Sequence, residues 1–205
     1  MCALLVCAAC APFADADQFS ALVVVAAAVL GVTGYTWFAA TRALPGPGRP
    51  ATVHRVRQQH RLTSRSWIEI DEEPEPRWVP VFFDPALVTM PTPTTATVHD
   101  VGRRCIVTWN GRRLLPSGRA RRSEPPGRLI DNPSRPDPDG PVRARVAARP
   151  ARRLVLDAQF AVAAPFAGAL WVYVAGGGLP AFAGATCVAA AVAVWLAAVR
   201  GSDPS

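Results

Sequence analysis

The sequence predicts an α-helical membrane protein that carries a small, mainly-β domain in the middle of its chain. Three observations support this fold class: long uncharged apolar segments, a proline-rich middle with short β-strand patterns, and arginines beside the apolar segments. Half of the 205 residues are hydrophobic, and they concentrate in residues 1–40 and 158–199. The predicted order is a membrane region, a domain over residues 41–157, a second membrane region, and a tail over residues 200–205.

The first long apolar segment covers residues 20–40 and contains no charged side chain. A helix of this length spans about 30 Å, which matches the hydrocarbon core of a bilayer. Tyr35 and Trp37 lie near its end, where aromatic side chains favour the membrane interface. We therefore expect one transmembrane helix here.

The second apolar segment, residues 158–199, also lacks charge and is long enough for two helices. Three glycines and Pro180 interrupt it, because glycine permits positive φ and proline cannot continue a helix. The sequence therefore predicts a transmembrane hairpin of helices 158–175 and 180–199. Pro165 is expected to kink the first of them.

Residues 1–13 are apolar but shorter than the roughly 20 residues that a crossing helix needs. Three interpretations remain open. The segment is the end of a further helix whose true start lies upstream, a complete short helix that leans on the helix over residues 20–40, or a frayed extension. A cleaved signal peptide is disfavoured because no basic residue precedes the apolar stretch.

All the basic residues are arginine, and those near the apolar segments lie on one side of them. They are Arg42, Arg49, Arg55, Arg57, Arg61, Arg65, Arg143, Arg145, Arg149, Arg152, Arg153 and Arg200. The opposite flank carries Asp15 and Asp17. By the positive-inside rule, the chain is a multi-pass protein of the cell (plasma) membrane with its central domain and tail in the cytoplasm.

The middle of the chain contains short runs with β-strand character. These are Val53–Gln58, Ser66–Asp71, Trp78–Phe83, Thr95–Asp100, Cys105–Trp109 and Arg112–Leu115. The first could instead continue a membrane helix, and Pro80 favours an edge or a bulge. Asn110-Gly111 predicts a hairpin turn, because both positions of a type I′ turn need positive φ. We expect a small sheet or barrel-like domain. Residues 143–157 could form a helix that continues into the membrane segment.

No residue pattern predicts a catalytic, cofactor-binding or metal site. His54, His60 and His99 lack the spacing of metal ligands, and the acidic run over residues 69–75 lacks the order of a calcium loop. Cys7 and Cys10 have CxxC spacing, which a redox or metal site uses, but small apolar packing residues are the simpler interpretation. The sequence therefore favours a protein without cofactors, although it leaves enzymatic activity undecided.

The most unusual local feature is the basic segment over residues 114–128, LLPSGRARRSEPPGR. Guanidinium groups bind phosphate in a bidentate way, so this segment could contact anionic lipid or a phosphorylated ligand. The candidate contact residues are Arg113, Arg119, Arg121 and Arg122. Nucleic acid is a less favoured ligand, because aromatic residues are not interleaved with these arginines.

The motifs WVPVFFDPALVTM and LLPSGRARRSEPPGR, together with the flanking apolar helices, resemble uncharacterised multi-pass membrane proteins of GC-rich actinobacteria. The resemblance implies a membrane location and no particular activity. The function expected from the sequence is that of a non-catalytic adaptor or accessory subunit whose partners are membrane lipids and another protein. The alternative is a membrane enzyme that acts on an anionic or lipid-linked substrate through the arginines and Glu124.

Overall fold

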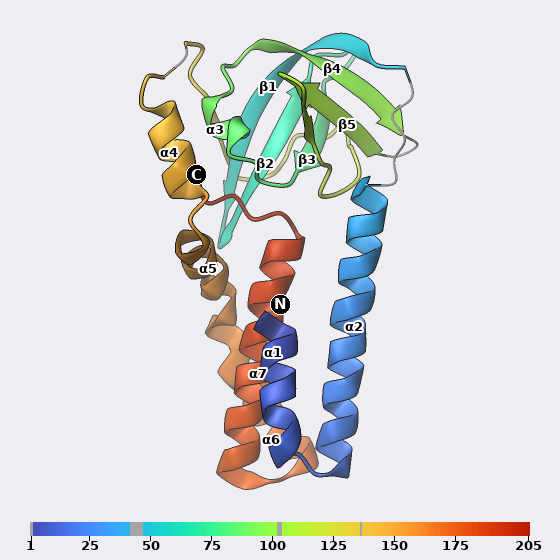
Figure 1. Ribbon diagram of the computed structural model, residues 1–205, viewed down its shortest axis with the longest axis vertical. Helices are drawn as coiled ribbons and strands as arrows, with labels where there is room; N and C mark the ends of the chain where they lie inside the picture. The colour runs from blue at the N-terminus through green and yellow to red at the C-terminus, as the bar shows by residue number, and fades with distance from the viewer. Residues whose placement is uncertain (1, 42–46, 102–103, 136) are drawn as a thin grey trace. The chain divides into compact units, whose positions relative to one another are not determined.

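The computed structural model describes residues 2–41, 47–101, 104–135 and 137–205, and its chain divides into two compact units (Figure 1). The helix unit comprises Met1–Trp37 and Leu154–Val199, and the barrel unit comprises Phe38–Arg153 and Arg200–Ser205. Arg42, which was counted among the flanking arginines, lies outside the described residues. The chain therefore passes between the two units at three places.

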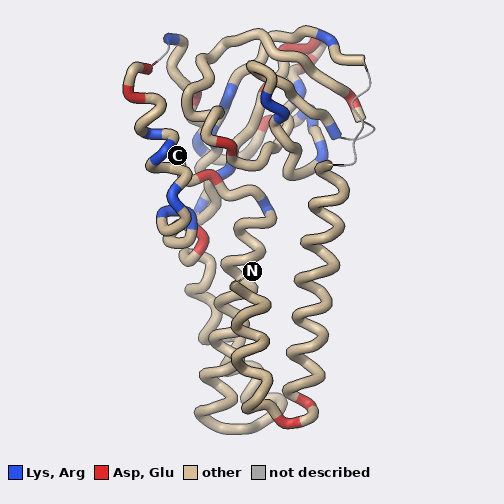
Figure 2. Tube along the Cα trace, viewed as in Figure 1, with Lys and Arg blue, Asp and Glu red and all other residues tan. Residues whose placement is uncertain are grey.

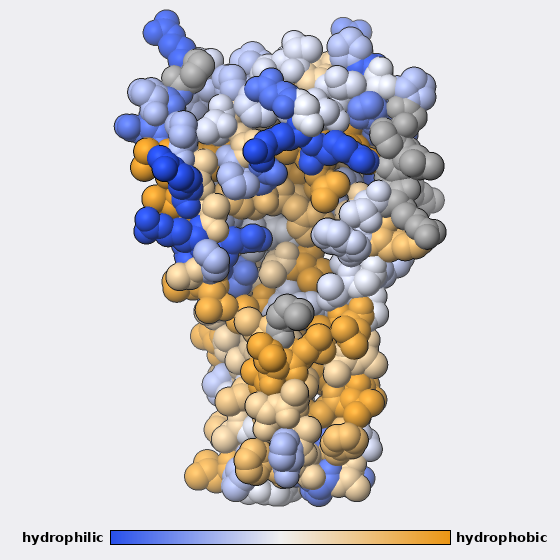
Figure 3. Space-filling model, in the orientation of Figure 1, coloured by the Kyte–Doolittle hydropathy of each residue, from blue (hydrophilic) through white to orange (hydrophobic). Residues whose placement is uncertain are grey.

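The helix unit contains three helical stretches that are long and apolar enough to cross a membrane, counted over the described residues. They are α2 (Ala16–Thr41), the stretch Pro150–Ala175, and α7 (Gly178–Val199). Their surfaces are mostly hydrophobic (Figure 3), as lipid-facing helices require. The three predicted long apolar helices are confirmed, and each starts earlier than expected.

The apolar N-terminal segment forms a short helix, α1 (Cys2–Cys10), followed by the 3₁₀ turn η1 (Ala11–Phe13). Nine helical residues extend only about 14 Å, which is half of the hydrocarbon core. Ala3 is buried in one cluster with Val29 of α2 and Ala191 of α7. The described part of this segment is therefore a short helix that packs against its neighbours.

Pro165 divides the stretch Pro150–Ala175 into α5 (Pro150–Ala158), the 3₁₀ turn η2 (Gln159–Ala163) and α6 (Ala164–Ala175). Proline has no N–H to donate to the carbonyl four residues earlier, at Ala161. That carbonyl instead accepts the N–H of Ala164, three residues on. The expected kink is therefore present as a tightened turn.

The hairpin of α6 and α7 turns where the sequence predicted it. Gly176, Gly177 and Gly178 have φ values of 75°, 93° and 63°, which side chains with a Cβ disfavour. The two helices approach closely at Gly168, where an added Cβ would lie 2.1 Å from Thr186 Oγ1. Glycine at this position is therefore what allows the two helices to pack.

The barrel unit is built on one antiparallel sheet of seven strands among the described residues, ordered β3-β2-β1-β4-β5-β6 with β7 beside β1. The strands are β1 (Arg49–His60), β2 (Thr63–Ile70), β3 (Arg77–Val81), β4 (Thr94–Val101), β5 (Arg104–Trp109), β6 (Arg112–Leu114) and β7 (Arg128–Asp131). The predicted small sheet is confirmed, and residues 53–58 are strand rather than helix. Two short helices, α3 (Ala86–Thr89) and α4 (Gly140–Ala147), complete the unit.

The sheet closes on itself through the segment that follows β6. Trp78 and Arg121 exchange two backbone hydrogen bonds of 2.7 and 2.9 Å, and the Ser117 N–H donates to the Pro80 carbonyl at 2.9 Å. Pro80 lacks an N–H but still accepts, so the closing segment can pair with β3 at this position. The result is a small barrel whose last side is irregular chain.

The barrel core follows the inward-facing positions of the strands. Its fully buried members include Val53, Ile68, Val79, Cys105 and Val107. The expected hairpin between β5 and β6 is confirmed, because both turn residues have positive φ, 46° for the asparagine and 73° for the glycine. Alternating apolar residues therefore account for the core positions, and one strong turn sequence accounts for the β5–β6 hairpin.

Candidate functional site

The segment Arg200–Ser205, directly after α7, is bound into the barrel. Ser202 forms an antiparallel bridge with Arg65 of β2, and the Asp203 N–H donates to the Ser64 carbonyl at 2.9 Å. Strand β3 pairs with β2 only from Ser66 onward, so the segment continues along the edge that β3 leaves open. It thus occupies the position of a short added strand.

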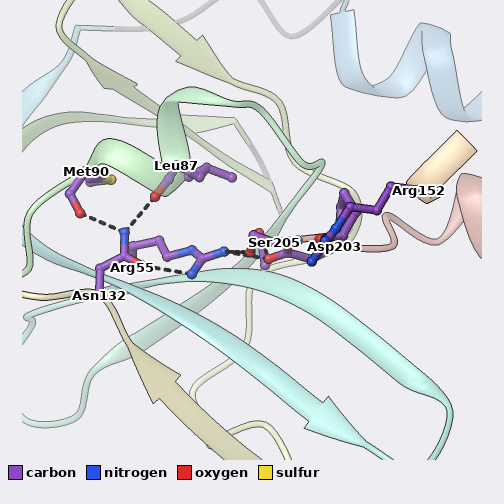
Figure 4. A network of polar contacts seen from close by, with 9 residues as sticks. Arg55, Leu87, Met90, Asn132, Arg152, Asp203 and Ser205 are labelled. Atoms are coloured by element: carbon purple, nitrogen blue, oxygen red, sulfur yellow. Dashed lines mark hydrogen bonds and ion pairs between the residues drawn. The ribbon is translucent and has the colours of Figure 1, made fainter. Parts of the chain in front are cut away.

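Asp203 anchors this segment through a buried carboxylate. Its side chain is 0% exposed, and Oδ2 accepts hydrogen bonds from Arg55 Nη2 and Ser66 Oγ, each at 2.6 Å (Figure 4). The Arg55 side chain is only 5% exposed, so both charges lie away from water. A charge of either sign without its partner would be costly here.

The Arg55 guanidinium has two further side-chain partners in the barrel. Its Nη1 donates to Asn132 Oδ1 at 2.8 Å and its Nη2 donates to Ser205 Oγ at 2.8 Å. Asn132 in turn donates to the carbonyls of Leu87, at 2.6 Å, and Met90, at 2.8 Å (Figure 4). Burial lowers the pKa of Arg55, and the charge of Asp203 opposes that shift. We call these bonded side chains the Arg55–Asp203 network.

Two more arginines hold the backbone of the same segment. Arg65 donates to the carbonyl of Arg200 from Nε at 2.8 Å and also from Nη2, and Arg152 Nε donates to the carbonyl of Pro204 at 2.7 Å. Burial lowers the pKa of Arg65, and the nearby charges of Arg200 and Arg121 lower it further. The segment is therefore fixed by both its side chains and its main chain.

The four sequence-predicted arginines have two different environments. Arg113, Arg119 and Arg122 are exposed on the barrel, where their guanidinium groups can reach a ligand. Arg121 is half-buried: its guanidinium lies 4.2 Å above the ring of Trp67, and burial lowers its pKa. Arg121 therefore supports the barrel, while the other three remain candidates for lipid or phosphate contact.

Glu72, in the acidic run, is paired with two arginines. Arg77 donates to Glu72 at 2.6 Å and to Asp100 at 2.5 Å, and Arg49 also pairs with Glu72. His54 Nε2 lies 3.4 Å from Asp71. Within the described parts of the chain, no three His, Cys, Asp or Glu side chains come together.

The sequence alone did not identify the Arg55–Asp203 network. Arg55 shares the inward face of β1 with the core residue Val53, since residues two apart point to the same side of a strand. An arginine at an inward position indicates a buried charge that needs a partner. That partner is 148 residues away in the sequence, and no local pattern connects the two.

The network joins parts of the chain that lie far apart in the sequence, so we assign it a structural role. Its carboxylate accepts three hydrogen bonds, from Arg55 Nη2 and Ser66 Oγ on Oδ2 and from the Ser205 N–H on Oδ1. Comparisons with protein-family models, with curated proteins and with solved structures find no match for this chain.

Proposed function

We propose that this protein is an integral membrane adaptor or accessory subunit that presents its barrel on the cytoplasmic side of the cell membrane. One observation carries the proposal. The barrel is joined to three long apolar helices, and its third connection is held in the barrel by the buried Arg55–Asp203 pair. A barrel connected in this way to membrane helices is suited to display a binding surface for another molecule.

The charges at the two ends of the helices support the proposed orientation. Asp15 and Asp17 lie at the start of α2, whereas Arg149 and Arg152 lie at the start of α5 and Arg200 follows α7 (Figure 2). Basic residues beside membrane helices favour the cytoplasmic side. The residues that enter and leave the barrel are therefore assigned to that side.

The exposed arginines supply the proposed contact surface. Arg113, Arg119 and Arg122 are exposed and can contact anionic lipid, phosphate or an acidic partner protein, at about 1 kcal/mol per arginine near an anionic leaflet. The enzymatic alternative would also use Arg121, whose guanidinium is held on Trp67. This contact favours the binding role over the catalytic one.

Cysteine labelling in intact cells tests the orientation. Ser123→Cys, on the exposed basic segment, is expected to react with a membrane-impermeant maleimide only after the cells are opened. Asp17→Cys, in the first turn of α2 and on the proposed outer side, is the matched variant. It is expected to react in intact cells. Labelling of Ser123→Cys from outside would contradict the proposal.

Affinity purification after mild detergent extraction tests the adaptor role. We expect one protein to co-purify in a constant ratio, and the ratio to fall when Arg113, Arg119 and Arg122 are replaced by alanine. A monodisperse protein that binds neither a partner nor anionic vesicles would contradict this function. Recovery of the chain in a detergent-free supernatant would contradict the membrane assignment itself.

A further inference from the structure

The helix unit contains an apolar cleft of about 870 Å³. Its walls come from α2, α6 and α7, and η1 closes one side. On α2 the lining residues include Gln18, Leu22 and Val25, which share one helix face by their spacing of four and three. The cleft is therefore formed by matched faces of several helices and not by a single gap between side chains.

The cleft is closed at one end by packed side chains. Ala3, Val29 and Ala191 are buried together there. Beside them Trp195 Nε1 donates to Thr33 Oγ1 at 3.0 Å, which ties α7 to α2. The cleft, which we call the slot, extends from this cluster to the start of α2, where Asp15 and Gln18 line it.

The depth of the slot matches one leaflet of a bilayer. Its lining on α7 runs from Pro180 to Val192, a distance of about 18 Å along a helix. Half of a bilayer's hydrocarbon core is about 15 Å thick. An acyl chain that enters near the start of α2 can therefore contact this lining along its length.

The end of the slot at the start of α2 is lined by two polar side chains, Asp15 and Gln18. Asp15 accepts the Gln18 N–H at 2.8 Å through one oxygen, Oδ1, at the start of α2. The sequence has no arginine or lysine in residues 1–41 or 154–199. An anionic headgroup would therefore meet an acidic side chain here and no basic one, whereas an ammonium group would meet a partner.

We propose that this slot binds one phospholipid whose headgroup carries an ammonium group, with an acyl chain between α2 and α7 and the ammonium at Asp15. The lining is mostly apolar, and lipid tails are the apolar molecules that surround a membrane helix. The inference rests on the proposed membrane insertion. It does not depend on which protein binds the barrel.

Native mass spectrometry of the full chain, released from nanodiscs with equal phosphatidylethanolamine and phosphatidylglycerol, tests the slot. Gly184→Phe fills it, because a Cβ at Gly184 meets no atom within 4 Å and the residue lines the cleft. Gly34→Phe is the matched control, with equally open space on α2 away from the lining. We expect Gly184→Phe to lower lipid retention about tenfold and Gly34→Phe to leave it unchanged.

The headgroup is tested by Asp15→Asn, which keeps a side chain able to cap α2 but removes the charge. We expect the wild type to retain phosphatidylethanolamine and this variant to retain both lipids equally, whereas Asp17→Asn keeps the wild-type preference. Equal retention by wild type and Gly184→Phe, or retention of detergent only, would overturn the slot. A wild-type preference for phosphatidylglycerol would overturn the headgroup assignment. Failure of the chain to enter membranes at all would instead show in fractionation.

Discussion

The barrel unit and the helix unit are each stabilised internally by a different kind of interaction. The barrel buries an ion pair, in which Asp203 also accepts from Ser66 Oγ and Arg55 also donates to Asn132 Oδ1. The described helices have few side-chain hydrogen bonds, such as that from Trp195 to Thr33, and pack through close approach at Gly168 and small apolar clusters. Hydrogen bonds between specific side chains therefore help to define the fold of the barrel, whereas close fit between small residues defines how the helices pack.

The largest expected effect comes from removing the buried carboxylate. Asp203→Ala leaves Arg55 buried without its charge partner, so the free energy of unfolding of the barrel should fall by about 3–5 kcal/mol. Asp137→Ala breaks the more exposed pair with Arg143 and should cost less than about 1 kcal/mol. Urea unfolding of the detergent-solubilised chain, followed by tryptophan fluorescence, measures both. Equal losses would show that the network does not hold the segment.

The second prediction concerns the pH dependence of the barrel. Burial raises the pKa of Cys105 from 9.0 to about 11, so the folded state favours the protonated thiol. Its contribution to stability is fully present below pH 9 and is lost as the pH rises through 11, by roughly 3 kcal/mol at most. Urea unfolding between pH 8 and pH 11 measures the loss. A Cys105→Ala chain should lack this part of the slope, and an unchanged slope would contradict the assignment.

The third prediction addresses shape in the helix unit. In Gly168→Leu the new Cβ meets Thr186 Oγ1 and the Phe182 carbonyl, so α6 and α7 must separate, at a cost of about 1–3 kcal/mol. Gly34→Leu enters open space and should have little effect. Thermal aggregation in mild detergent compares the two. If both variants aggregate at the same temperature, close packing at Gly168 is not what holds the hairpin.

The sequence predicted most of the fold because the relevant patterns are local. Uncharged length identified the three long helices, and alternation with an Asn-Gly turn identified β5 and β6. Closure of the barrel by residues 115–121 was not predictable, since that segment has no strand pattern and pairs only through isolated bridges. The position of Asp203 was missed for the same reason, because a short polar tail has no pattern that indicates burial.

The smallest expected effect separates the predicted arginines into two groups. Arg121→Ala removes the cation–π contact with Trp67, which should lower the stability of the barrel by about 1 kcal/mol. Arg122→Ala, on the exposed neighbour, should leave stability unchanged, and together with Arg113→Ala and Arg119→Ala it should weaken binding to anionic vesicles or to the partner. Urea unfolding and vesicle co-sedimentation of the detergent-extracted chain measure the two quantities separately. If Arg122→Ala destabilised the barrel as much as Arg121→Ala, the two groups would not be distinct. Because Arg121 packs on Trp67 while the other three arginines are exposed, substitution of the exposed arginines should alter binding without altering the fold.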